Sequence, residues 1–179
     1  MVYLYGDMFA STSFLGHRHV VSGKRLNPVE LRKAIKIATI VNLYESRVID
    51  LFLQVKKGLL RKHEELIIEL LKDIEPPNFL IEKEFLALLK EKRKIPLRFS
   101  IPNIYGFGID EKKWMDYTAK IMNQELAKKG YLKKEENGRY LPIEVAIKSL
   151  ESKALEIKAK VSDFETKKKD IIKKIYANL

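Results

Sequence analysis

Histidine and carboxylate side chains are the groups in this chain that could bind a metal ion or transfer protons. His17 and His19 would share one face of a β-strand and could bind a metal ion, but no third ligand lies nearby in the sequence. We therefore expect both histidines at the surface. Glu64, Glu65 and Glu69 fall on the polar side of an amphipathic segment, where solvated carboxylates are the usual arrangement. These residues predict no catalytic group and no metal site.

One further stretch could carry chemistry, because Gly23–Lys24 is similar to the end of a phosphate-binding loop. The preceding Gly16 is too distant for that motif, and Arg25 replaces the Ser or Thr that would bind magnesium. No nucleophile in the sequence has a recognisable base partner. We therefore predict that the chain is not an enzyme and needs no cofactor.

The composition favours a globular protein that binds polyanions. The 179 residues are 46% apolar and 33% charged, and the formal net charge is +11 with a pI near 9.6. The excess positive charge is spread along the chain instead of forming one basic tail. The sequence has no cysteine, which excludes disulfides and thiolate metal sites.

The sequence carries no clear targeting or membrane signal. Residues 1–25 lack the basic start, apolar block and cleavage site of a secretory signal. The apolar stretch 35–55 is interrupted by Lys36, Glu45 and Arg47, so it is a poor membrane span. We expect a cytoplasmic protein without membrane association.

Helices are expected to dominate the first half of the chain. Residues 1–26 could form one or two short strands or an arm. A first helix should begin at Asn27, a capping residue, and its apolar positions continue to about Lys57. Further helices are predicted at residues 63–74 and 81–92, and residues 95–109 suit a short strand and a loop.

A helix followed by a β-hairpin is expected in the second half. The helix should span residues 111–129 and end at Gly130. The Asn137–Gly138 pair favours the positive φ angles of a tight hairpin turn, and Pro142 ends the second strand. The sequence therefore predicts a two-stranded hairpin between residues 131 and 141.

The last quarter of the chain carries a narrow apolar seam whose positions alternate in steps of four and three. Such a stripe needs another helix to cover it. The seam positions expected to pair two chains are Ile147, Leu150, Ile157, Val161, Phe164, Ile171 and Ile175. We predict a long coiled-coil helix over residues 143–179 that forms a homodimer. The alternative is that this helix packs on the first helix of its own chain.

The order of these elements resembles the winged helix-turn-helix superfamily. The resemblance covers residues 62–142 and depends on the helix ending Leu-Ala-Lys-Lys-Gly-Tyr-Leu at 126–132 and the hairpin closed by Asn-Gly-Arg at 137–139. It implies a mainly α fold, with a winged-helix-like α+β domain, a small β-hairpin wing and the long C-terminal coiled-coil helix. The expected domains are 1–61, an arm and long core helix; 62–142, the winged-helix-like domain; and 143–179, the dimerisation helix.

The chain departs from the family pattern in one place, where the family joins its second and third helices by a tight turn. If the helix at 81–92 is the second, about fifteen residues separate it from the third. Alternatively, that helix is the first and the second is reduced to a turn near residues 102–105.

In this superfamily the third helix enters the major groove and the wing lies along the DNA backbone or in the adjacent minor groove. The resemblance therefore implies that the helix at 111–129 reads DNA. Lysine and arginine suit phosphate contacts, and Asn or Gln can contact adenine through both a donor and an acceptor. The implied contact residues are Lys112, Lys113, Lys120, Asn123, Gln124, Lys133, Lys134 and Arg139.

These observations lead to two main hypotheses. The first is a dimeric winged-helix protein that binds double-stranded DNA as a transcriptional regulator, with two reading helices on half-sites about one DNA turn apart. The second is a helical adaptor or subunit of a larger assembly, which would use the winged domain and the coiled coil for protein contacts alone. The even spread of charge favours the second hypothesis. An enzyme acting on nucleic acid would require acidic residues that converge in the fold.

Overall fold

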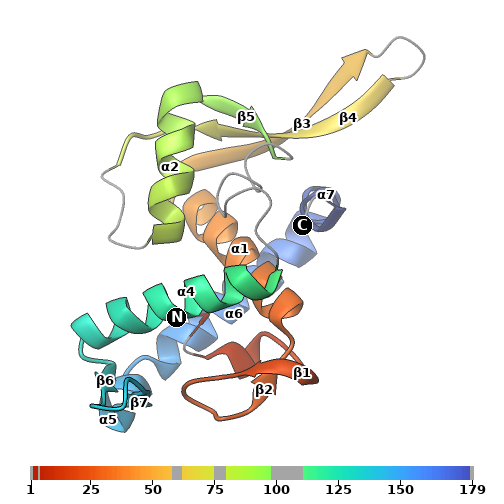
Figure 1. Ribbon diagram of the computed structural model, residues 1–179. Helices are drawn as coiled ribbons and strands as arrows, with labels where there is room; N and C mark the ends of the chain where they lie inside the picture. The colour runs from red at the N-terminus through yellow and green to blue at the C-terminus, as the bar shows by residue number, and fades with distance from the viewer. Residues whose placement is uncertain (1, 4, 58–61, 75–79, 98–110, 178–179) are drawn as a thin grey trace. The chain divides into compact units, whose positions relative to one another are not determined.

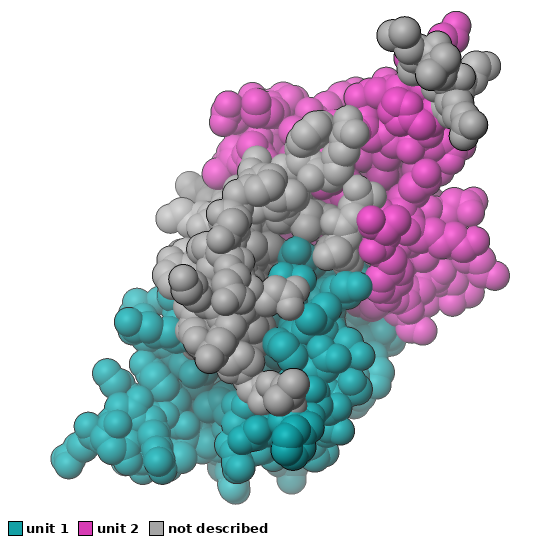
Figure 2. Space-filling view, turned by 45° about the vertical axis from the view of Figure 1, so that its right-hand side comes forward, with its two compact units in different colours: residues 1–38, 109–159 teal, residues 39–108, 160–179 magenta. Residues whose placement is uncertain are grey.

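The computed structural model describes residues 2–3, 5–57, 62–74, 80–97 and 111–177 (Figure 1). The chain divides into two compact units, which Figure 2 distinguishes by colour. Unit 1 consists of Met1–Ala38 and Ile109–Ala159, and unit 2 of Thr39–Gly108 and Lys160–Leu179. The described residues are mainly helical, as the sequence predicts, but they also contain three small antiparallel sheets. None of their helices has the length and apolar character that crossing a membrane would require.

Unit 1 combines two small hairpins with helical segments. Its elements are the 3₁₀ helix η1 (Gly6–Met8), β1 (Thr12–Arg18), β2 (Arg25–Leu26), the first part of α1 (Pro28–Glu45), α4 (Glu111–Lys128), β6 (Leu132–Lys134), β7 (Tyr140–Pro142), α5 (Glu144–Lys148) and the first half of α6 (Glu151–Lys167). The hydroxyl of Tyr3 donates to Oδ1 of Asn123 at 3.2 Å, and that of Tyr5 donates to the carbonyl of Ile147. Two buried tyrosines therefore anchor the N-terminal segment to α4 and α5.

Helix α1 begins as its sequence predicts. Oδ1 of Asn27 accepts from the backbone N–H groups of Val29 at 3.0 Å and Glu30 at 3.3 Å, which satisfies donors that the first helical turn leaves unpaired. The carboxylate of Glu30 accepts from the backbone N–H of Ser11 at 2.7 Å. This contact ties the start of α1 to the segment before β1.

Unit 2 contains a three-stranded antiparallel sheet with strand order β3-β4-β5. Its elements are the end of α1, β3 (Ile49–Lys57), β4 (Lys62–Leu70), α2 (Leu80–Lys92), β5 (Lys94–Pro96), the end of α6 and α7 (Lys169–Ala177). Both α2 and α7 contact the central strand β4. Consecutive residues of β4, Leu66, Ile67 and Ile68, are buried. Because successive side chains of a strand point to opposite faces, β4 is covered on both faces at this point.

Two helix predictions in this unit are wrong. The helix expected over residues 27–57 ends at Glu45 and continues as β3, and residues 63–74, expected to be helical, contain β4. A run of apolar residues such as Leu66–Ile68 is buried in either structure, so periodicity cannot separate the two. The helix at 81–92, the helix at 111–129 and the hairpin after it are confirmed as α2, α4 and β6–β7.

The C-terminal region forms three helices, α5, α6 and α7, instead of the single helix expected. Of the seven seam positions, Ile147, Leu150, Phe164 and Ile175 are buried within the chain itself, and the other three are half-buried. In unit 2 the Phe164 ring packs edge to face on Tyr44 of α1, with 5.4 Å between ring centroids. This is the arrangement expected if the seam packs on its own chain. Homodimerisation stays a prediction, and those four side chains do not present a free seam for it.

The end of α1 is closed by a residue in the left-handed region. Arg47 has a φ of 53°, its N–H donates to the carbonyl of Tyr44 at 2.9 Å, and the N–H of Val48 donates to that of Leu43 at 2.9 Å. These two bonds form a Schellman motif, in which glycine is the usual residue at the position of Arg47. Arg47, which is exposed, therefore adopts a backbone conformation that is strained for a residue with a Cβ atom.

We predict that Arg47→Gly raises the free energy of unfolding by up to about 1 kcal/mol. The substitution removes the strain energy of a left-handed backbone at a residue with a Cβ atom, and this gain should exceed the entropy cost of ordering a more flexible glycine on folding. Urea unfolding followed by circular dichroism measures the change. The control is Arg47→Ala, which removes the same side chain but keeps a Cβ and should change stability little. Equal effects of the two substitutions would contradict the backbone explanation.

Candidate nucleic-acid interface

The end of α4 fixes the start of the hairpin through a second Schellman motif. The N–H of Gly130 donates to the carbonyl of Ala127 at 3.0 Å, and that of Tyr131 donates to Leu126 at 2.9 Å. Gly130 has a φ of 76°, which glycine adopts without steric cost. The predicted stop at Gly130 is thus confirmed. Leu126 and Leu132 are both only 2% exposed, so buried side chains hold each side of this turn.

The hairpin itself is closed at both ends by hydrogen bonds. At the tip, the N–H of Gly138 donates to the carbonyl of Glu135 at 2.9 Å, and the N–H of Glu135 donates to that of Arg139 at 2.8 Å. Only the glycine of the Asn–Gly pair has a positive φ, 81°, so the turn carries a glycine bulge and is not the tight two-residue turn expected. At the base, the N–H of Ile143 donates to the carbonyl of Tyr131 at 3.0 Å.

Together, α4 and the hairpin present a set of exposed polar side chains that we call the helix–wing surface. Its members are Lys120, Gln124, Lys133, Lys134 and Arg139. Helix α4 contacts β6, so all five come from adjoining elements of unit 1 (Figure 1). Residues 120–139 contain six basic and three acidic side chains. One of the acids, Glu125, is paired with Lys128 at 2.7 Å on the same helix. The net positive charge of this segment favours an anionic partner.

Three other predicted DNA-contact residues are not part of the helix–wing surface. Asn123 is half-buried, and its Oδ1 accepts the hydroxyl proton of Tyr3, so this internal bond competes for the acceptor that a bidentate contact with adenine would use. Lys112 and Lys113 belong to α4, but their side chains lie outside the described part of the structure. Gln124, which is exposed, is the amide on α4 that remains suited to reading a base.

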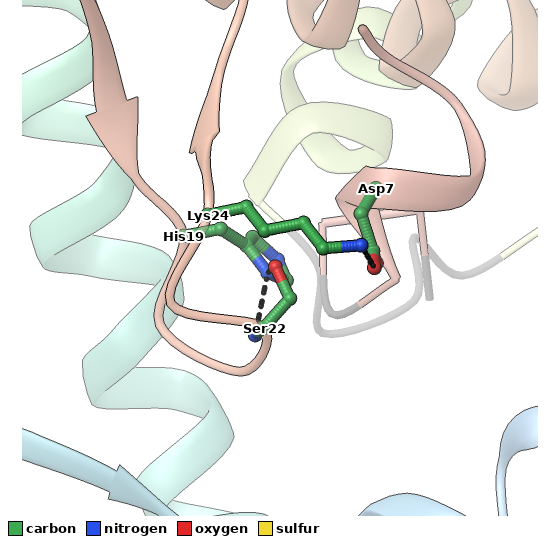
Figure 3. Close-up of polar contacts among 4 residues, drawn as sticks. All are labelled: Asp7, His19, Ser22 and Lys24. Atoms are coloured by element: carbon green, nitrogen blue, oxygen red, sulfur yellow. Dashed lines mark hydrogen bonds and ion pairs between the residues drawn. The ribbon is translucent and has the colours of Figure 1, made fainter. Parts of the chain in front are cut away.

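His19 follows β1, and its ring contacts Ser22 in the turn that leads to β2 (Figure 3). The side chain is 5% exposed, so the expectation of a surface histidine is wrong for His19; the side chain of His17 lies outside the described residues. Nδ1 of His19 accepts the backbone N–H of Ser22 at 3.1 Å, and Nε2 lies 2.6 Å from the carbonyl oxygen of Tyr3. Nε2 therefore carries the proton of the neutral ring.

Burial also perturbs the titration of this cluster. Burial lowers the pKa of His19 from 6.5, although the Tyr3 carbonyl and the nearby Asp7 partly oppose the change. It raises the pKa of Tyr3 to about 12, and the hydrogen bond to Asn123 partly offsets that shift. The structure thus keeps both groups uncharged at neutral pH. Hydrogen bonds from His19 to Tyr3 and from Tyr3 to Asn123 therefore link the N-terminal segment to α4.

Two of the three carboxylates singled out in the sequence form ion pairs in unit 2. They lie on strand β4 and not on a helix. Glu65 is buried and pairs with Lys56, and Glu69 pairs with Lys94 of β5 at 2.9 Å. In the described part of the chain, no three His, Asp or Glu side chains converge as metal ligands would.

Sequence reasoning missed the N-terminal residues that contact α4 and α5. Residues 1–26 were expected to form one or two short strands or an arm, but Tyr3 and Tyr5 lie in turns beside η1 and contact partners more than a hundred residues away. No local sequence pattern predicts such a contact. The only available signal was the density of aromatic residues at positions 3–9, which is unusual for a solvent-exposed arm.

A scan against protein-family models found no match for this chain, and comparisons with curated proteins and with solved structures found no significant match. The function proposed below is therefore based on the geometry of the helix–wing surface.

Acidification should destabilise the fold through His19. Because burial lowers its folded-state pKa, the stabilisation from the neutral ring is fully present above pH 6.5 and is lost as the pH falls through the lowered pKa. We predict that the difference in melting temperature between the wild type and His19→Gln, whose side chain does not titrate, narrows from pH 7.5 to pH 5. A constant difference across this range would contradict the assignment.

Proposed function

We propose that this chain binds double-stranded DNA through the helix–wing surface. In this proposal α4 lies in the major groove and the β6–β7 hairpin lies along the phosphate backbone. The observation that carries the proposal is the presence of Lys120 and Gln124 on an exposed helix next to Lys133, Lys134 and Arg139 on an exposed hairpin. A helix fits the major groove of B-form DNA, and cations beside it can reach the flanking phosphates.

The side chains divide naturally into two roles. The lysines and Arg139 would contact phosphates, which gives affinity without sequence preference. Gln124 has a donor and an acceptor on one amide and would read an adenine in the groove. The hydrogen-bonded turn at Gly130 fixes the hairpin to the end of the helix. Binding would therefore cost less conformational entropy than it would if the hairpin had first to be ordered.

The winged-helix interpretation is retained here for the helix and the wing only. Residues 63–74, which were to supply an earlier helix of the domain, contain β4 and belong to unit 2, whereas α4 and the hairpin belong to unit 1. A transcriptional regulator is the role we propose for a DNA reader of this kind. The proposal does not require a dimer, because four seam side chains are already buried within the chain.

An adaptor function is the second candidate, and one observation favours it. Leu141, Ile143 and Val145, at the junction of β7 and α5, are 45%, 38% and 83% exposed. Adjacent exposed apolar side chains are characteristic of protein-binding surfaces. An adaptor would lack affinity for duplex DNA at low salt and would bind a protein partner with little dependence on salt.

We predict that Lys133→Ala/Lys134→Ala weakens duplex binding equally for all sequences. Each lost phosphate contact should reduce the slope of log affinity against log salt by about 0.9, so the double variant should lower it by about 2. Fluorescence anisotropy with a labelled duplex at several salt concentrations measures both quantities.

The matched control is Lys153→Ala/Lys158→Ala, which removes two exposed lysines from α6 in unit 1 and hence the same net charge. This control should keep a near wild-type slope. If both double variants change the slope equally, binding depends on overall charge and not on the wing. No duplex binding by the wild type at low salt would exclude the proposed function.

Gln124→Ala should reduce sequence discrimination more than affinity. A bidentate base contact is worth about 1–3 kcal/mol of preference for the correct base, whereas binding to unrelated DNA depends on phosphates. Selection from a randomised duplex library identifies the preferred site, and competition assays then compare it with variants that replace each adenine. Lys120→Ala serves as the contrast, since it should weaken all sites alike. Unchanged discrimination in Gln124→Ala would remove Gln124 as a reader.

A further inference from the structure

Strand β1 contains an irregular segment that exposes an aromatic side chain. Thr12 and His17 of β1 both pair with Leu26 of β2, so the register shifts between them. Phe14 lies inside this shift and is 90% exposed, more than any other large apolar side chain among the described residues. The guanidinium of Arg25 donates to the carbonyl of Phe14 at 3.0 Å, which fixes the backbone that presents the ring.

Two arginines occupy directly opposed positions of the same strand pair. Arg18 on β1 pairs directly with Arg25 on β2, and both side chains are exposed. Like charges at directly opposed positions destabilise a β-sheet. An anion bound between the two guanidinium groups would remove that repulsion, and arginine is the side chain best suited to a phosphate.

We infer that Phe14, Arg18 and Arg25 form a site for an unpaired nucleotide of a nucleic-acid strand. The base would stack on the exposed ring of Phe14, and its phosphate would bind the two arginines. Aromatic rings beside positive charge are the usual means by which proteins hold single-stranded segments, and every base can stack on such a ring. The inference rests on the proposed function, because it adds a single-strand contact to a duplex-binding chain.

This site differs from the helix–wing surface in the elements that form it and in the chemical groups that it presents. It is built from β1 and β2, whereas the helix–wing surface comes from α4, β6 and β7. It holds no amide for reading a base edge; its ring and guanidinium groups suit any nucleotide. We therefore expect it to recognise the single-stranded state of a nucleotide rather than its sequence.

The test compares two labelled probes with the full-length protein: a blunt duplex, and the same duplex with a short single-stranded overhang. The wild type should bind the overhang probe more tightly. Phe14→Ala should remove roughly tenfold of affinity for that probe, the order expected for a lost stack, and leave blunt-duplex binding unchanged. Phe14→Trp should retain or increase the preference, because it keeps an aromatic face.

The matched control is Leu155→Ala, which truncates another exposed apolar side chain of unit 1, 53% exposed, without an arginine pair beside it in the sequence. It should leave the overhang preference intact. A photoreactive 5-iodouracil in the overhang should crosslink to Phe14, as identified by mass spectrometry.

The outcomes separate the two proposals. Equal binding of both probes by the wild type, or an unchanged preference in Phe14→Ala, overturns the nucleotide site while leaving duplex binding in place. Binding of a single strand without binding of the blunt duplex overturns the proposed duplex function and supports the site. A mononucleotide that competes for the overhang preference as well as a strand does would show that free nucleotides are the ligand, which contradicts the assignment to a strand.

Discussion

The reversal of the chain at Gly130 fixes where the hairpin cations lie relative to those of α4. Two backbone hydrogen bonds, from Gly130 to Ala127 and from Tyr131 to Leu126, close the helix, and a φ of 76° at Gly130 turns the chain into β6. The bond from Ile143 to Tyr131 then returns the hairpin to the same point. Because backbone hydrogen bonds make these connections, substitution of surface side chains can change the charges without changing the path of the backbone. The proposed function can therefore be tested by side-chain replacement.

Support for α4 comes from the start of the chain. Tyr3 is bonded to Asn123 on the helix and, through its own carbonyl, to the buried His19 ring. A buried polar group is stable only when its hydrogen bonds are made, so these contacts specify how the N-terminal segment lies against α4. The seam has a comparable internal role: Tyr44 receives Phe164 in unit 2, and the carbonyl of Ile147 accepts from Tyr5 in unit 1. Four of the seven side chains expected to join two chains, Ile147, Leu150, Phe164 and Ile175, are buried within the chain itself.

The sequence predicted the element boundaries that are set by neighbouring residues. It did not distinguish helix from strand where the only pattern was a run of buried apolar residues. Asn27 identified the start of α1, and Gly130 identified the end of α4, because caps depend on neighbouring residues. The break after Glu45 was missed because its left-handed residue is Arg47 and not glycine. Strand β4 was mistaken for a helix, since a strand covered on both faces loses the alternation that marks it. For the candidate interface, exposure of Gln124 followed from helical position, but the engagement of Asn123 by Tyr3 depends on a contact across 120 positions that no pattern encodes.

Chemical footprinting of lysines can show which surface of the protein contacts DNA. The full-length protein would be treated with an amine-reactive reagent, with and without a duplex at low salt, and the modified positions quantified by mass spectrometry. DNA bound at the helix–wing surface should protect Lys120, Lys133 and Lys134, while Lys153 and Lys158, which are also exposed but lie on α6, should remain reactive. Protection of Lys153 and Lys158 with continued modification of Lys133 and Lys134 would contradict it.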